Sequence, residues 1–386
     1  MAQFKSKDRN TTFIKGKYSS FIFSLYFSNT QPHDMFSFKR FIPPIRCAAL
    51  QQQHHCHHYC FSQISQASAI RKLINDDVDS FVFDCDGVLW TGDKAIPGAA
   101  DIIGKLRKAG KKLVFLSNSA VKTPTDLVIK AQSMKFSVNQ EEVMTSGIAA
   151  AQLLKSLKLR TDAAVYVVGG GGLCDTLEEY CPGISCLVGG ETFPGESQVP
   201  SNNAKEEQLF RTFEDFASFV GKRLVTSGVQ TALDPEGKVA AVVVSRQNDF
   251  DYFTTARASA LLRYNEGIHF IATNIDEASP SISASLLVPA AGTMVAAVET
   301  ASGRKSISVG KPSKKLADVV VETFQLNPKR TLMVGDRLNT DVAFGKISGM
   351  KTLLVLSGVA QIEDLETLKP TEIPDYVLPS IADLHI

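Results

Sequence analysis

Cysteine, tryptophan and long apolar runs are scarce in this sequence, and their scarcity excludes several classes of protein. Seven cysteines in 386 residues, with no Cys-x-x-Cys pair, exclude a disulfide-built scaffold and favour a reducing compartment. No run of 18 or more apolar residues occurs, so we expect no transmembrane helix and no membrane partner. The 41 Lys and Arg nearly balance the 40 Asp and Glu, and there is one Trp, so we expect no nucleic-acid partner.

Glutamate is absent from the first 140 residues, and the charges are unevenly distributed. Residues 1–75 carry ten Lys and Arg but only two acids, Asp8 and Asp34. This basic segment, rich in Ser and Phe, predicts either an organelle transit peptide or a disordered tail with no targeting function. A transit peptide would direct the chain to the chloroplast or the mitochondrion, and without one we expect a cytoplasmic protein. Four histidines lie within residues 54–60, where incidental low-complexity sequence is favoured over a metal site.

From residue 78 onward, short apolar runs alternate with helical patterns. Strands are expected at 80–83, 112–116, 306–309, 331–334, 351–356 and 376–378. This alternation predicts an α/β fold with a Rossmann-like parallel-sheet core. A second α/β stretch lies between the two halves, with strands expected at 164–168, 240–245 and 269–273. We therefore expect a core at 76–156 and 279–386, and an inserted domain at 157–278 that carries a long insertion near 189–238.

Two aspartates, Asp84 and Asp86, follow the strand expected at 80–83. Two carboxylates at the end of a buried strand are costly unless a cation binds them. Mg²⁺ typically takes one or two carboxylates together with phosphate oxygens. With the metal bound, one aspartate can attack phosphorus while the other transfers protons. Taken alone, the Asp-x-Asp-Gly pattern also fits an ordinary turn or a Ca²⁺ loop.

Two further strand ends carry residues that suit a phosphate group. Ser117 and Asn118 follow the strand expected at 112–116, where a hydroxyl and the backbone N–H groups of a turn can bind phosphate oxygens. Lys311 follows the strand expected at 306–309 and could neutralise a phosphate or a neighbouring carboxylate. Each signal is weak alone, because Ser-Asn-Ser is common in loops and a single lysine is more often a surface charge.

A second pair of acids follows the strand expected at 331–334. Asp336 ends this strand, and Asp341 lies five residues further on. With Asp84 and Asp86 they give four carboxylates, about what the first and second shells of a Mg²⁺ site need. Ligands of open α/β sheets bind at the carboxyl ends of the strands, so we expect these acids to meet there.

The order and placement of these motifs resemble the haloacid dehalogenase-like phosphatases. The resemblance is closest to their 4-nitrophenylphosphatase-like branch, which includes phosphoglycolate phosphatases and pyridoxal phosphate phosphatases. It extends from Asp79 to the C-terminus. The sequences that carry it are 84–90 (DCDGVLW), 297–304 (AVETASGR), 309–313 (VGKPS), 333–338 (MVGDRL) and 352–359 (TLLVLSGV).

The resemblance implies a Mg²⁺-dependent phosphomonoesterase that works through an aspartyl-phosphate intermediate. Asp84 would be the nucleophile and would also bind Mg²⁺. Asp86 would protonate the leaving alcohol and then activate the attacking water, and its backbone carbonyl would bind the metal. Such an arrangement suits phosphoryl transfer, in which catalysis is mainly positioning and electrostatics.

The resemblance also implies roles for the other motif residues. Ser117 and Asn118 would hold the phosphoryl oxygens, and Lys311 would neutralise them. Asp336 would complete the protein's share of the metal ligands, with Asp341 in support. The inserted domain would be a cap that closes over the core and selects the substrate, and relatives form homodimers through this cap.

Within this branch, 2-phosphoglycolate is the expected substrate, and pyridoxal phosphate is the alternative. Pyridoxal phosphate phosphatases tend to place a His near the position of Ser279, and this chain has none there, which disfavours pyridoxal phosphate as the substrate. Relatives also usually carry an Arg-Asp pair where this chain has Ile275 and Asp276. A phosphoprotein phosphatase that docks its substrate on the long insertion near 189–238 is a third hypothesis. A non-catalytic binding protein is disfavoured because the motif residues are intact.

Overall fold

The structure, a computed structural model, describes residues 70–188, 234, 237–280 and 286–384. The expected leader at 1–75 therefore lies outside the described residues except for its last six, and the histidine-rich segment at 54–60 lies wholly outside them. The expected insertion at 189–238 also lies outside, apart from residues 234, 237 and 238. In the part of the chain that is described, no helix has the length and apolar character needed to cross a membrane.

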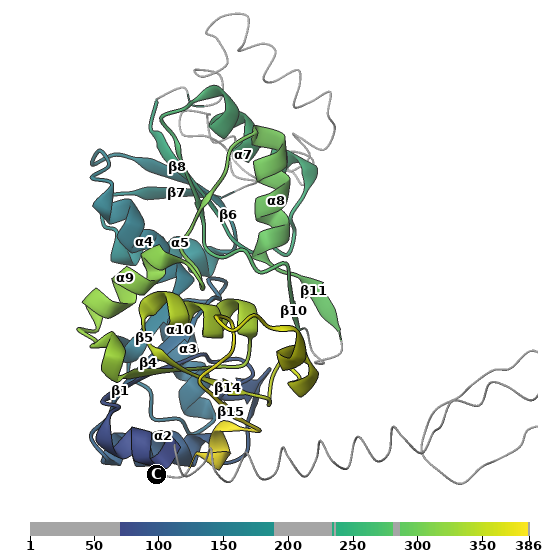
Figure 1. The fold of residues 1–386 in the computed structure, drawn as a ribbon. Helices are drawn as coiled ribbons and strands as arrows, with labels where there is room; N and C mark the ends of the chain where they lie inside the picture. The colour runs from purple at the N-terminus through teal and green to yellow at the C-terminus, as the bar shows by residue number, and fades with distance from the viewer. Residues whose placement is uncertain (1–69, 189–233, 235–236, 281–285, 385–386) are drawn as a thin grey trace, which may run out of the picture. The chain divides into compact units, whose positions relative to one another are not determined.

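Six parallel strands form the first sheet, in the order β15-β14-β13-β1-β4-β5 (Figure 1). Its strands are β1 (Ser80–Phe83), β4 (Lys112–Ser117), β5 (Val143–Thr145), β13 (Thr331–Gly335), β14 (Lys351–Val355) and β15 (Tyr376–Leu378). Strand β1 lies between β4 and β13, with Phe83 level with both Phe115 and Val334. This sheet confirms the predicted parallel α/β core, built from two halves of the chain.

Helices cover both faces of the first sheet. They are α2 (Ala99–Lys108), α3 (Pro124–Ser133), α9 (Lys314–Thr323) and α10 (Ala343–Ser348). Helices α2 and α3 pack with Phe81, Phe83 and Phe115 on one face. Helices α9 and α10 pack with Val82 and Val114 on the other. Because successive side chains of a strand point to opposite faces, every residue of β1 is buried.

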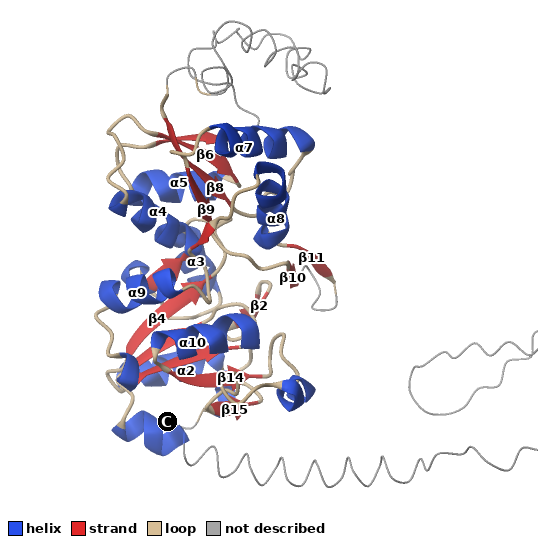
Figure 2. Cartoon of the chain, turned by 45° about the horizontal axis from the view of Figure 1, so that its top comes forward, coloured by secondary structure: helices blue, strands red, loops and turns tan. Residues whose placement is uncertain are grey.

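A second parallel sheet has the strand order β12-β9-β8-β6-β7. Its strands are β6 (Ala164–Val168), β7 (Ser185–Val188), β8 (Val239–Val244), β9 (His269–Ala272) and β12 (Ile307–Ser308). Its helices are α4 (Ser146–Ser156), α5 (Gly171–Tyr180), α7 (Tyr252–Tyr264) and α8 (Ala291–Ser302). Helices α4 and α5 cover one face, and α7 and α8 cover the other (Figure 2).

Two elements of this second sheet lie beyond residue 278, where we expected the inserted domain to end. Helix α8 packs against the sheet through Met294 and Val298. Strand β12 pairs with β9, at Ile307 and Ile271, whereas we had placed it among the core strands. The reason is that a short apolar run indicates a buried strand without indicating its neighbour.

Short elements complete the described chain. They are two antiparallel hairpins, β2 (Trp90–Thr91) with β3 (Lys94–Ala95) and β10 (Ala278–Pro280) with β11 (Leu287–Pro289), and the segments η1 (Gln140–Glu142), η3 (Pro328–Arg330), η4 (Leu338–Val342), η5 (Ile362–Thr367) and η6 (Ile381–Asp383). The first hairpin follows β1 directly, and the π-helical segment η4 follows β13. Both lie at the carboxyl edge of the first sheet.

Replacing Phe115 with Ala should destabilise the chain strongly. Phe115 is fully buried and stacks on Phe83, with ring centroids 6.0 Å apart, so the substitution leaves a cavity under the central strands. We expect the free energy of unfolding, measured by urea denaturation, to fall by about 3–5 kcal/mol. Replacing Ile129, which is 60% exposed on α3, with Ala should change it by less than about 0.5 kcal/mol. Equal losses in the two variants would contradict this account of the core.

Candidate functional site

The carboxyl ends of neighbouring strands bring the predicted site residues together. Asp84 follows β1, Ser117 ends β4, and Asp336 follows β13. Since β4 and β13 flank β1 in parallel, these three residues reach the same edge of the sheet. Asp341 lies within η4, and its Oδ2 accepts hydrogen bonds from the backbone N–H groups of Asp336 and Arg337, each at 3.1 Å.

Lys311 forms the centre of this site. Its Nζ donates to Asp84 Oδ1 at 2.5 Å, to Asp341 Oδ1 at 2.7 Å and to the carbonyl oxygen of Leu116 at 3.4 Å. The side chains of Lys311 and Asp341 are 2% and 1% exposed, whereas that of Asp84 is 13% exposed. A charge this deeply buried is stable only when it is paired and hydrogen-bonded, and both conditions hold here. The structure thus places Lys311 against the carboxylates.

Burial and neighbouring charges both shift the pKa values of these groups. Burial raises the pKa of Asp84 well above its usual range, and the Asp341 and Asp336 carboxylates add to the rise while Lys311 opposes it. Burial and the nearby Asp341 carboxylate raise the pKa of Asp336 to about 7. Burial alone would lower the pKa of Lys311, but Asp341 and Asp84 outweigh it, and that pKa lies above its usual value. The cluster therefore contains more negative charge than one ammonium group compensates.

Three carboxylates of this cluster could hold a metal ion. Asp84, Asp336 and Asp341 each offer an oxygen, and these oxygens lie within 4.8 Å of one another. The second oxygen of Asp336, Oδ2, accepts the N–H of Val359 at 2.8 Å, but its Oδ1 is buried and has no hydrogen-bond partner. A buried carboxylate oxygen without a partner is costly, and a hard divalent cation would satisfy it. These residues fit such a cation.

The side chain of Asp86 lies outside this carboxylate cluster. It is 63% exposed, and its Oδ1 accepts a hydrogen bond from Trp90 Nε1 at 3.0 Å. The three grouped acids therefore do not include Asp86. The alternation of a strand would put Asp84 and Asp86 on one face, but Asp86 lies beyond the end of β1, in the turn at Gly87, where the alternation no longer applies. The implied contact through the Asp86 backbone carbonyl concerns a different atom and stays a prediction.

Asn118 connects the end of β4 to the loop that carries Lys311. Its Oδ1 accepts the backbone N–H of Lys311 at 2.7 Å, and its Nδ2 donates to the Asp276 carboxylate at 3.2 and 3.3 Å. Its backbone oxygen accepts hydrogen bonds from Asn274 Nδ2 and Ser146 Oγ. The side chain of Asn118 is thus engaged with protein groups, and Ser117 beside it is buried.

Two glycines make room for Asp336. A Cβ on Gly358 would lie 1.9 Å from Asp336 Oδ2, and a Cβ on Gly87 would lie 2.2 Å from the same atom. Gly87 also has a φ of +89°, which disfavours other residues. Neither Gly358 nor Asp276 was expected from the sequence to contact a site residue. Gly358 lies 22 positions from Asp336, and Asp276 lies 158 from Asn118, so no local pattern could have revealed either contact.

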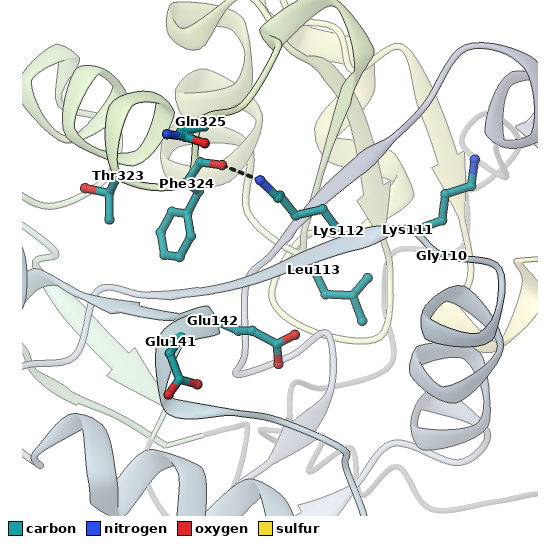
Figure 3. A pocket seen from close by; sticks show the side chains of 9 residues that line it. All are labelled: Gly110, Lys111, Lys112, Leu113, Glu141, Glu142, Thr323, Phe324 and Gln325. Atoms are coloured by element: carbon teal, nitrogen blue, oxygen red, sulfur yellow. Dashed lines mark hydrogen bonds between the residues drawn. The ribbon is translucent and has the colours of Figure 1, made fainter.

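A pocket of about 380 Å³ opens at the other end of β4 (Figure 3). Lys112, Glu142 and Phe324 are among the residues that line it, and Lys112 Nζ donates to the carbonyl oxygen of Phe324 at 2.8 Å. Because Lys112 begins β4 and Ser117 ends it, this pocket lies at the amino end of the strand. It contains none of the predicted site residues.

Comparisons with known proteins agree with this geometry. A family model described as haloacid dehalogenase-like hydrolase matches residues 81–181, and a second, HAD-hydrolase-like model matches residues 308–384. The chain is 34% identical to phosphoglycolate phosphatase 1A, chloroplastic, of Arabidopsis thaliana, over 82% of this chain and 81% of that protein. It is 33% identical to human chronophin, over 83% of this chain and 96% of that protein.

Solved structures show the same architecture. The glycerol phosphate phosphatase of Mycobacterium tuberculosis in complex with magnesium aligns with a TM-score of 0.61 and 25% sequence identity. The alignment covers 81% of this chain and 78% of that one. Extensive sequence identity and a shared fold therefore support the same assignment. The chain belongs to the haloacid dehalogenase-like hydrolase family, in its phosphatase branch.

Proposed function

We propose that this chain hydrolyses small phosphate monoesters, with 2-phosphoglycolate as its substrate and Asp84 as its nucleophile. The observation that carries the proposal is the position of Asp84. Its carboxylate lies at the carboxyl edge of a parallel sheet, beside the Lys311 ammonium and within a cluster of three acids. Phosphoryl groups need this combination of an in-line carboxylate, a cation and a metal site.

Asp84 acts on the phosphorus atom. A carboxylate oxygen of Asp84 forms a bond to phosphorus as the bond to the alcohol oxygen breaks, and Asp86 gives that oxygen a proton. Asp86, now a carboxylate, takes a proton from a water molecule that attacks phosphorus. Phosphate then leaves, and Asp84 is free again. The phosphorus–oxygen bond of the ester and that of the acyl phosphate are both broken without a co-reactant other than water.

The remaining residues hold the phosphoryl group and its charge. Lys311 neutralises the phosphoryl oxygens, Ser117 binds them through its hydroxyl, and Asn118 binds them through the backbone of the turn, since its side chain holds Lys311 and Asp276. Mg²⁺, held by Asp84, Asp336 and the Asp86 carbonyl with support from Asp341, would supply the positive charge that the cluster lacks. The buried position of Lys311 keeps its ammonium fixed, so little reorganisation is needed when the substrate charge changes.

The second sheet and its helices form the cap in this proposal. We place the phosphatase core at 76–156 and 279–386 and the cap at 157–278. Helix α4 before this range, and α8 and β12 after it, also pack on the cap's sheet. The Asn118–Asp276 and Asn118–Asn274 hydrogen bonds link the end of β4 to the segment that follows β9. A cap attached at the site can exclude water and select the leaving group, and we expect a homodimer through this cap.

Replacing Asp84 with Asn should abolish turnover. The amide cannot attack phosphorus, so we expect kcat to fall by about 10³-fold or more while the chain stays folded. EDTA should abolish the wild-type activity, and added Mg²⁺ should restore it. Steady-state hydrolysis of 4-nitrophenyl phosphate measures both effects. The exposed Asp101 of α2, replaced with Asn, serves as the matched control, and robust activity in the Asp84 variant would refute the mechanism.

The substrate is tested by comparing kcat/KM on several phosphate esters. Identity to two chloroplastic phosphoglycolate phosphatases of Arabidopsis thaliana, and the absence of a His near Ser279, support 2-phosphoglycolate. We expect kcat/KM for 2-phosphoglycolate to exceed that for pyridoxal phosphate and for a phosphopeptide by about tenfold or more, a difference of about 1.4 kcal/mol in transition-state binding. A higher value for pyridoxal phosphate or the phosphopeptide would assign the chain to that substrate instead.

We also propose that residues 1–75 direct the chain into chloroplasts. Their basic, Ser-rich composition and the chloroplastic relatives support this location. The full chain, incubated with isolated chloroplasts and then with protease, should yield a shortened, protected product. A chain that lacks residues 1–75 should stay unprotected. Protection by isolated mitochondria alone would favour that organelle, and protection by neither would leave a cytoplasmic protein.

A further inference from the structure

The carboxylate of Asp86 has two neighbours that the proposed chemistry does not use. Trp90 Nε1 donates to its Oδ1 at 3.0 Å, and Lys130 Nζ lies 3.7 Å from the same oxygen. Lys130 Nζ also lies 5.1 Å from the centroid of the Trp90 ring. The three side chains therefore form one contact group, which we call the Asp86 clamp. An exposed carboxylate would otherwise rotate freely in water.

Trp90 is a rigid donor in this clamp. It is 1% exposed, and its ring packs edge-on against Phe136, with centroids 5.6 Å apart. The loop that joins Asp86 to Trp90 is closed by backbone hydrogen bonds, from Gly87 N to Trp90 O at 2.7 Å and from Trp90 N to Cys85 O at 3.3 Å. Because the ring cannot move, the direction of its N–H determines where the Asp86 carboxylate lies.

Lys130 comes from a different element. It lies in the last turn of α3, and its side chain is 23% exposed. Both the face of the Trp90 ring and the Asp86 carboxylate stabilise its ammonium group, so the two contacts hold it in one place. A lysine that was simply exposed to solvent on the surface of α3 would make neither contact. Helix α3 thereby supports Asp86, which lies three residues after the end of β1.

We propose that Trp90 and Lys130 are positioning residues that orient the Asp86 carboxyl group toward the leaving oxygen of the substrate. This inference rests on the proposed function, because it assumes that Asp86 protonates that oxygen. It has a specific consequence. An alkoxide such as glycolate is a poor leaving group and needs the proton, whereas 4-nitrophenolate is a stable anion that leaves with little help.

The clamp is tested by replacing Lys130 with Met in the full chain. General acid catalysis is worth about 10²–10⁴-fold, and loss of orientation should remove part of it. Asp86 also activates the water of the second step, which is the same for every substrate, so the comparison uses kcat/KM, which reports only the steps up to departure of the leaving group. We expect kcat/KM to fall about tenfold on 2-phosphoglycolate and to change by less than about twofold on 4-nitrophenyl phosphate. Lys130→Arg should recover most of the loss. Lys108→Met, at an exposed lysine in the last turn of α2, is the matched control and should change neither substrate.

Trp90 provides a readout that needs no turnover. It is the one tryptophan in the sequence, so its fluorescence reports on the clamp directly. Lys130→Met should shift the emission of the full chain in EDTA, and Lys108→Met should not. Trp90→Phe keeps an aromatic ring against Phe136 but removes the N–H donor, and it should show the same leaving-group dependence as Lys130→Met.

Several results would overturn the inference. An equal fall in kcat/KM on both substrates would show a loss that does not depend on the leaving group. A rise in KM for 2-phosphoglycolate alone, with kcat retained, would show that Lys130 binds the substrate carboxylate. An unchanged emission spectrum in Lys130→Met would show that the ammonium does not rest on the ring. Failure of the proposed function is distinct, because it would appear as wild-type chain inactive on both esters or as full activity in Asp84→Asn.

Discussion

The buried ammonium of Lys311 is the contact on which the site depends. It joins Asp84 after β1 to Asp341 in η4, and its own backbone N–H binds Asn118 after β4. Three segments that are far apart in the sequence are thereby held at one edge of the sheet. Removing one partner of a buried ion pair typically costs about 3–5 kcal/mol, because a charge is left without compensation. The same lysine thus organises the site and carries the charge that a phosphoryl group requires.

The two aspartates after β1 have opposite environments. Asp84 is mostly buried in a cluster with excess negative charge, where burial raises its pKa and a cation favours its ionised form. Asp86, two residues later, is 63% exposed and bound to an indole N–H. In the proposed chemistry one group must attack as a carboxylate while the other delivers a proton. Different environments for two identical side chains allow this division.

Much of the fold could be predicted from local patterns. The strands expected at 80–83, 112–116 and 331–334 correspond to β1, β4 and β13, because short apolar runs ending in polar residues are typical of buried parallel strands. The expected strand at 306–309 exists as β12, but it pairs in the second sheet. Helix α8 likewise packs beyond the limit expected for the inserted domain. Which strand or sheet an element packs against depends on surfaces contributed by distant segments. A single apolar run does not indicate these surfaces.

The sequence by itself determined which residue types reach the site: aspartates, a serine with an asparagine, and a lysine, each placed after an expected strand. Only the tertiary structure decided which of these residues contact one another. It placed Asp84, Asp336 and Asp341 together, turned the Asp86 carboxylate toward Trp90, and brought Gly358 against Asp336. The physical reason is that residue type and strand-end position are local properties. The direction of a side chain and the closeness of a distant backbone arise only when the chain is packed.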